Sequence, residues 1–148
     1  MEEYLNDLKE FDTVIMGRKT YEFGYQYGLK PGQPAYPHMD HHIISNSLKF
    51  DNPSDQVSIH KPSVQHIHDL KAEKGSDIYL CGGGVFAGWL LAYGLIDRLK
   101  IKLNPFIAGG GTPMFVHEGD PTAYQLSQIS SHGYDHGLQI VEYQLDYN

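Results

Sequence analysis

The 148-residue chain has one cysteine, few basic residues and no long apolar run, and each shortage excludes a class of protein. Cys81 alone cannot form an internal disulfide, which fits a reducing compartment. No apolar stretch reaches the roughly 18 to 20 residues that a membrane-spanning helix needs. The acidic N-terminal segment is also unlike a signal peptide. We therefore expect a cytoplasmic protein made of a single domain, residues 1–148.

Acidic residues outnumber basic ones by 18 to 11, which gives a formal net charge of −7. The long-range field of such a chain repels nucleic-acid backbones and anionic membranes, so neither is expected as a partner. A locally positive pocket could still hold one phosphorylated small molecule. The content of 41% hydrophobic and 20% charged residues is that of a folded globular domain.

Helix-like and strand-like segments alternate over the first hundred residues, and strand-like segments follow. Strands are expected over residues 13–17, 41–45, 56–60, 77–82, 97–104, 123–131 and 138–147, and helices over residues 2–12, 18–28, 63–75 and 85–93. Residues 29–40 contain three prolines and a glycine and are expected to form a loop. This order predicts an α/β fold with a mostly parallel central sheet and a C-terminal antiparallel hairpin.

For two of the expected helices, the sequence predicts the capping residues or the buried face. Ser63 is a suitable N-cap for the helix over residues 63–75, and Gly75 a suitable stop. For the helix over residues 85–93 we expect one buried face, formed by apolar residues at helical spacing: Val85, Phe86, Trp89, Leu90 and Tyr93.

The segment VIMGRKTYE places a strand end at Gly17 directly before Arg18, Lys19 and Thr20. Free N–H groups at a helix start attract anions, and two cations and a hydroxyl would add charge-assisted hydrogen bonds to phosphate. The segment is not a P-loop, because no glycine directly precedes Lys19. The pattern fits either a phosphate site or a solvated first turn that Thr20 caps.

The segment YLCGGGVFAGW places Gly82, Gly83 and Gly84 between a strand and a helix. Such glycines permit either a sharp turn or a ligand that approaches closer than a Cβ allows. In dinucleotide sites they let a diphosphate lie against the backbone, but G-x-G-x-x-G is not matched here because Ala87 stands at the third glycine position. Tight internal packing and a phosphate site both remain open.

Two other features are interpreted as structural. Residues 104–115, NPFIAGGGTPMF, are expected to form a loop between strands, and the alternative is a loop that lines a substrate pocket. Cys81 is interpreted as a buried thiol rather than a nucleophile.

The nine histidines raise the question of a metal site. His41 and His42 point to opposite faces of a strand, and His66 and His68 diverge on a helix. Neither H-E-x-x-H nor C-x-x-C is present, so no metal is expected.

The chain resembles the dihydrofolate reductase superfamily in the order and spacing of three segments: VIMGRKTYE, HHIISNS and DIYLCGGGVFAGWLLAYGLIDRLKIKLNPFIAGGGTPMF. The likeness is closest to the reductase domain of bacterial riboflavin biosynthesis and covers about residues 2–147. The third segment is the most specific, since it joins three glycines, an aromatic-rich helix and GGGTPMF. The resemblance implies a three-layer dihydrofolate reductase-like fold.

The resemblance also implies that NADPH lies across the carboxyl ends of the strands. The G-R-K-T segment would hold phosphate near the adenosine end, the residues after the next strand would lie beside the adenine ribose and its 2′-phosphate, and the triple glycine would hold the pyrophosphate. The implied cofactor-binding residues are Gly17, Arg18, Lys19, Thr20, Ser45, Asn46, Gly82, Gly83, Gly84 and Val85. A non-proline cis peptide bond is implied in the glycine run, usually Gly82–Gly83.

Family members begin with a strand and an S-L-D-G segment well upstream of the G-R-K-T motif, whereas 16 residues precede Gly17 here. We therefore expect this domain to lack the first strand, and no catalytic residue is assigned. The expected function is an NADPH-dependent reductase of a pterin-like or aminopyrimidine substrate, nearer to riboflavin-type pyrimidine reductases than to folate enzymes. The alternative is a non-catalytic nucleotide-binding or assembly module. A homodimer is expected, because relatives often pair and an unpaired sheet edge favours association.

Overall fold

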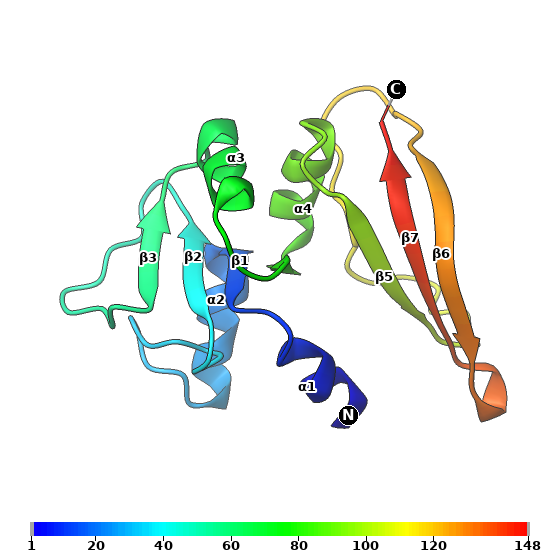
Figure 1. Cartoon of the computed structure of the whole chain (residues 1–148), viewed down its shortest axis with the longest axis horizontal. Helices are drawn as coiled ribbons and strands as arrows, with labels where there is room; N and C mark the ends of the chain where they lie inside the picture. The colour runs from blue at the N-terminus through cyan, green and yellow to red at the C-terminus, as the bar shows by residue number, and fades with distance from the viewer. Residues whose placement is uncertain (1, 148) are drawn as a thin grey trace.

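A computed structural model describes residues 2–147 of the chain (Figure 1). Seven strands, four α-helices and two short 3₁₀ segments follow one another within these residues. Their order is α1 (Glu2–Leu8), β1 (Thr13–Gly17), α2 (Arg18–Phe23), η1 (Gly24–Tyr27), β2 (Asp40–Ile44), β3 (Val57–His60), α3 (Val64–Ala72), β4 (Ile78–Gly82), α4 (Gly84–Ala92), β5 (Arg98–Leu103), β6 (Gln125–Gly133), η2 (Asp135–Gly137) and β7 (Gln139–Asp146).

The first four strands form a parallel sheet in the order β3-β2-β1-β4. In the pairing of β1 with β2, Gly17 lies opposite Ile44, and in the pairing of β1 with β4, Met16 lies opposite Gly82. Ile44 in turn lies opposite His60 of β3. The carboxyl ends of all four strands therefore meet at one edge of the sheet.

The last three strands form an antiparallel sheet in the order β5-β7-β6. The predicted α/β class, with parallel strands followed by an antiparallel hairpin, is confirmed. The hairpin β6–β7 is extended by β5, whose alternating sequence pairs along β7 from Arg98–Gln144 to Leu103–Gln139. Within residues 2–147 the two sheets have separate hydrogen-bonding ladders, and α4 lies between them (Figure 1).

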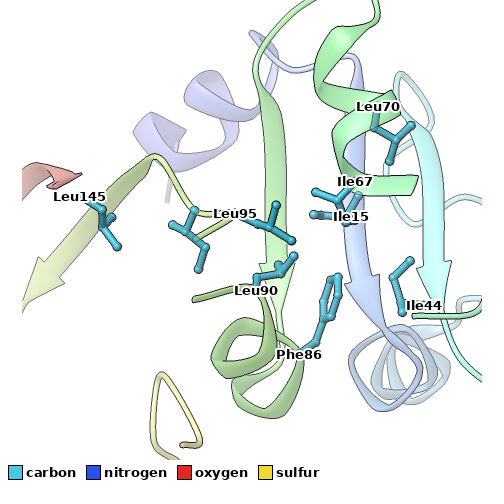
Figure 2. Packing of buried hydrophobic residues seen from close by; sticks show 9 residues of the cluster. Ile15, Ile44, Ile67, Leu70, Phe86, Leu90, Leu95 and Leu145 are labelled. Atoms are coloured by element: carbon cyan, nitrogen blue, oxygen red, sulfur yellow. The ribbon is translucent and has the colours of Figure 1, made fainter. Parts of the chain in front are cut away.

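The parallel sheet is covered on both faces. On one face, α3 and α4 bury a cluster of aliphatic side chains and Phe86, and Figure 2 shows Phe86, Leu90, Ile67 and Leu70 gathered over Ile15 of β1. On the other face, α1, α2 and the loop over residues 29–39 cover a second cluster, whose buried members are Leu8, Val14, Met16, Tyr21, Met39, Ile43 and Val57. Strand alternation assigns neighbouring residues of β1 and β2 to opposite clusters, which gives the expected three layers.

The predicted buried face of α4 is wrong at two of its five positions. Val85 is 65% exposed and Tyr93 is 59% exposed, whereas the buried residues include Ala87 and Gly88. The backbone of Val116 lies directly on Gly88, where a Cβ atom would overlap its carbonyl oxygen. Small residues therefore form a second buried side of this helix, which hydrophobic periodicity does not reveal.

The helix α3 ends at Ala72, three residues before the predicted stop at Gly75. Gly75 has φ +156°, and a Cβ atom there would lie 2.7 Å from a carboxylate oxygen of Asp12. That carboxylate accepts hydrogen bonds from the Ser76 backbone N–H and hydroxyl, which lower the pKa of Asp12. Gly75 thus permits the close approach of Asp12, just before β1, and is not a helix cap.

The predicted N-cap of α3 is confirmed, because the Ser63 hydroxyl accepts a hydrogen bond of 3.2 Å from the His66 backbone N–H. We expect Ser63→Ala to lower the free energy of unfolding by about 1 kcal/mol, the usual effect of removing such a cap. Ser63→Asp keeps an acceptor and should retain most of the stability. Urea unfolding measures both, and equal losses in the two variants would contradict this role of the hydroxyl.

Among residues 2–147, none of the helices combines the length and the apolar character that crossing a bilayer would require.

Candidate functional site

The carboxyl edge of the parallel sheet brings together the three predicted phosphate-binding segments. Gly17 ends β1, Gly82 ends β4, and Ser45 directly follows β2. A Cβ atom on Gly17 would lie 3.9 Å from both the Gly82 carbonyl oxygen and the Gly83 nitrogen. Two motifs separated by more than sixty residues in sequence therefore share one small area of backbone.

The glycine run has the backbone form that the resemblance implied. The Gly82–Gly83 peptide bond is cis, and Gly82 has φ +122°, a conformation that L side chains rarely adopt. A Cβ atom on Gly83 would lie 3.0 Å from the Thr20 hydroxyl oxygen. The Thr20 hydroxyl therefore lies against Gly83, and a side chain at position 83 would crowd it.

At Gly84, the glycine run permits tight internal packing, which is one of the two interpretations open from the sequence. A Cβ atom there would lie 2.5 Å from the Pro113 carbonyl oxygen, and the Gly84 carbonyl accepts a 2.9 Å hydrogen bond from the Val116 N–H. Residues 113–116 thus pack on the first turn of α4. This contact supports the interpretation of residues 104–115 as a structural loop. Residues 113–116 therefore occupy the space beside the Gly84 Cα atom.

The N-terminal turn of α4 is oriented toward the same edge. Gly83 caps the helix without a side-chain hydrogen bond, and its carbonyl accepts the first intrahelical bond, from the Ala87 N–H. The N–H groups of an α-helix's first turn have no intrahelical acceptor, and the helix dipole gives them a partial positive charge. An anion placed beside Gly82 and Gly83 would meet these donors.

The Arg18 guanidinium is held between two elements of this edge. Its Nε donates to Glu22 at 2.8 Å, within α2, and its Nη1 donates to the Ser47 hydroxyl at 3.0 Å, in the turn after β2. The side chain is 46% exposed, so solvent or a ligand can still reach the guanidinium. Lys19 is exposed and adds a second positive charge. Arg18 therefore connects the ends of β1 and β2.

Ser45 and Asn46, which follow β2, differ in their hydrogen bonding and exposure. The Ser45 hydroxyl accepts hydrogen bonds from the backbone N–H groups of Ser47 and Leu48, at 3.2 and 3.0 Å, so its oxygen stabilises the turn. Asn46 is exposed. Both line an open groove of about 490 Å³ whose other lining residues are Leu48, Lys49, Phe50, Pro53, Val57, Ser58, Ile59 and Lys61. Lys49 and Lys61 belong to no motif, so the sequence alone does not indicate their place in this groove.

Cys81 lies beneath the edge, where it packs against the cluster around Met16 and Tyr21. Its sulfur lies 3.5 Å from the Tyr36 hydroxyl, and Tyr79 packs beside Tyr36. Burial raises the pKa of both tyrosines, which keeps their hydroxyls protonated. Cys81 is half-buried rather than fully buried as predicted, and these contacts support its interpretation as a structural thiol.

The histidines lie partly as predicted. His41 is buried on one face of β2, where its Nδ1–H donates to the Met39 carbonyl and its Nε2 accepts from the Tyr36 N–H. His42 lies on the opposite face. Burial of its ring, and to a lesser extent repulsion from His60 and His66, lowers the pKa of His42 to about 4. His42, His60 and His66 come from three different elements but meet in space, which the spacing of neighbouring histidines does not indicate.

The comparison with protein families matches residues 2–140 to the RibD C-terminal domain. Two curated Bacillus subtilis (strain 168) proteins are similar to the chain. YwjB is 27% identical over 132 residues, which cover 88% of this chain and 73% of YwjB. YyaP is 24% identical over 116 residues, which cover 74% of this chain and 62% of YyaP. The chain therefore spans less than two thirds of the length of one of these relatives.

Solved structures share the fold at low sequence identity. A protein from Shewanella sp. PV-4 assigned to riboflavin biosynthesis matches with a TM-score of 0.79 and 22% identity, and a pyrimidine reductase-like protein from Corynebacterium diphtheriae with a TM-score of 0.68 and 18% identity. Each match covers 99% of this chain and 81% of the other. Acinetobacter baumannii RibD matches with a TM-score of 0.59 and 14% identity, over 92% of this chain and 47% of RibD.

Proposed function

Because the chain belongs to the RibD C-terminal domain family, a reductase-like family with the dihydrofolate reductase-like fold, we propose that it binds NADPH and reduces a pterin-like or aminopyrimidine heterocycle. One observation carries the proposal. The glycine run and the G-R-K-T segment, far apart in sequence, lie against each other at the carboxyl edge of a parallel sheet. In open α/β sheets, ligands bind in the crevice outside the carboxyl ends of the strands.

The pyrophosphate would lie beside Gly82 and Gly83. The first-turn N–H groups of α4 point to this place, and the Thr20 hydroxyl already lies against Gly83. Arg18 would supply charge-assisted hydrogen bonds from the neighbouring strand end. Gly84 and Val85 would contribute backbone N–H groups rather than side-chain contacts, because glycine has no side chain and the Val85 side chain faces solvent.

The groove beside Ser45 and Asn46 is suited to the adenosine end of the cofactor. Lys49 and Lys61 line it, so a 2′-phosphate would meet two positive charges in a chain whose overall charge is negative. NADH lacks that phosphate. The groove therefore supports a preference for NADPH, with Asn46 and the lysines as the residues nearest the ribose.

When bound, NADPH supplies the hydride for the reduction. The residues of this chain bind and orient the cofactor: glycine backbone at the pyrophosphate, Arg18 and Thr20 beside it, and the lysines at the far end. None of the residues gathered at this edge is assigned to proton transfer. This distribution of roles also fits the second candidate function, a nucleotide-binding module that has no reductase activity.

Binding and turnover separate these two functions. We expect NADPH to bind saturably, and its nicotinamide absorbance to fall when an aminopyrimidine or dihydropterin substrate is added, at a rate proportional to protein concentration. Saturable binding without loss of absorbance for either substrate would assign the chain as a binding module. Absence of binding would contradict both functions.

A further inference from the structure

Three histidines converge on the α3 side of the parallel sheet. His42 comes from β2, His60 from β3 and His66 from α3. One ring nitrogen from each lies within 4.8 Å of those of the other two, and His42 Nδ1 lies 3.2 Å from His60 Nε2. The His60 and His66 rings are stacked with their centroids 3.9 Å apart. All three side chains are partly buried.

The fold positions each ring independently. Strand alternation directs His41 toward Tyr36 on one face of β2, and therefore directs His42 to the other face. The parallel register places His42 opposite Ser58 and Ile44 opposite His60, so His42 and His60 are diagonal neighbours. The Ser63 cap fixes the first turn of α3, and the buried Ile67 next to His66 holds the helix on the sheet. The cluster thus rests on secondary structure rather than on loops.

One buried ring nitrogen of the cluster has no hydrogen-bond partner within residues 2–147. The Ser58 hydroxyl donates to the His41 carbonyl and lies 2.8 Å from His60 Nε2 and 3.4 Å from His42 Nδ1. His66 Nε2 is buried, and within residues 2–147 it has no hydrogen-bond partner. A buried polar atom without a partner is rare and unfavourable, because the desolvation of that atom is not compensated. Something that the protein itself does not supply would satisfy His66.

We propose that His42, His60 and His66 bind one divalent transition-metal ion of the zinc class. Zn–N distances of about 2.0 to 2.1 Å with tetrahedral angles place two ligand nitrogens about 3.3 Å apart. The His42–His60 pair already has this spacing, and the widest pair must close by at most about 1.5 Å from 4.8 Å. Three imidazoles without a carboxylate favour Zn²⁺, Co²⁺, Ni²⁺ or Cu²⁺ over Mg²⁺ and Ca²⁺.

Such an ion would join α3 to the two strands on which it packs. Three histidines would leave the fourth tetrahedral position open to a water, and the Ser58 hydroxyl lies 2.8 Å from His60 Nε2 and 3.4 Å from His42 Nδ1, close to two of the three ligands. Ser58 also lines the groove that holds Lys49 and Lys61. The ion therefore strengthens the scaffold under the adenosine end of the proposed cofactor site. The metal site does not depend on that cofactor being bound.

The test uses the full chain without a histidine tag, treated with a chelator and then dialysed. Calorimetric titration with Zn²⁺ should give saturable binding of one ion per chain, and Co²⁺ should give the intense visible absorption of a tetrahedral site. Zn²⁺ should also raise the melting temperature, because an ion that binds only the folded state stabilises it. His66→Gln should weaken Zn²⁺ binding at least tenfold, since loss of an outer-shell partner alone costs about 10- to 100-fold.

His68→Gln is the matched control, because His68 is exposed on the same helix and lies outside the cluster. It should bind Zn²⁺ as the wild type does. His60→Asn provides a second test of the cluster, and circular dichroism shows whether each variant is folded. The proposal is refuted if wild type shows no saturable binding, which would mean that only water satisfies His66. It is equally refuted if the folded cluster variants bind as tightly as His68→Gln.

Discussion

Gly88→Ala is expected to lower the free energy of unfolding by about 3 kcal/mol or more. Helix propensity alone predicts the opposite sign, because alanine in the middle of a helix is about 1 kcal/mol more favourable than glycine. The structure reverses this expectation, since a Cβ atom on Gly88 would overlap the Val116 carbonyl oxygen. The obstacle is backbone rather than a flexible side chain, so α4 or residues 113–116 must move. Chemical unfolding monitored by Trp89 fluorescence measures the loss.

Gly110→Ala is the matched control for this prediction. Gly110 lies in the loop over residues 104–115, and a Cβ atom there would meet nothing within 4 Å. Its φ lies outside the positive range that disfavours L side chains. We expect a change within about 0.5 kcal/mol, or a slight gain from the stiffer unfolded chain. A stabilising Gly88→Ala would show that the contact between α4 and Val116 is not as described.

Arg18→Ala is expected to weaken NADPH binding roughly 10- to 150-fold, the equivalent of about 1.5 to 3 kcal/mol for a hydrogen bond to a charged group. The guanidinium is held by Glu22 and Ser47 beside the glycine run, so little of its binding contribution goes to ordering the side chain. The unfolding free energy should change little, because an exposed ion pair contributes at most about 1 kcal/mol. Fluorescence titration and urea unfolding separate the two effects.

Arg98→Ala controls for the loss of one positive charge. Arg98 also forms an exposed ion pair, with Glu142 at 3.6 Å, but lies on β5 of the antiparallel sheet. Its removal should leave NADPH affinity unchanged within a factor of about two to three, since Arg98 lies outside the proposed phosphate-binding segments and salt screens exposed charges. Equal weakening in both variants would assign the effect to net charge and not to a phosphate contact by Arg18.

Local features of the fold were predictable from the sequence because they depend on neighbouring residues. The run TVIMG forms β1 at its predicted bounds, since a short apolar segment bounded by polar residues and glycine favours a buried strand. The Ser63 cap likewise needs only a hydroxyl before a helix. The cis Gly82–Gly83 bond was implied only by resemblance, and no local pattern indicates it.

The features that sequence patterns missed come from contacts between distant segments. The buried side of α4 is determined by Val116, and the close approach at Gly84 by Pro113. The histidine cluster needs the register of β2 and β3 together with the placement of α3. Tertiary packing decides these positions, so neither periodicity nor motif spacing could indicate them.

Titration of the wild-type chain with NADPH and with NADH shows whether the carboxyl edge of the parallel sheet is a cofactor site. We expect saturable binding of one NADPH per chain, with weaker binding of NADH, because Lys49 and Lys61 line the groove beside Ser45 and Asn46. Failure of NADPH to saturate the protein, or tighter binding of NADH, would contradict this expectation.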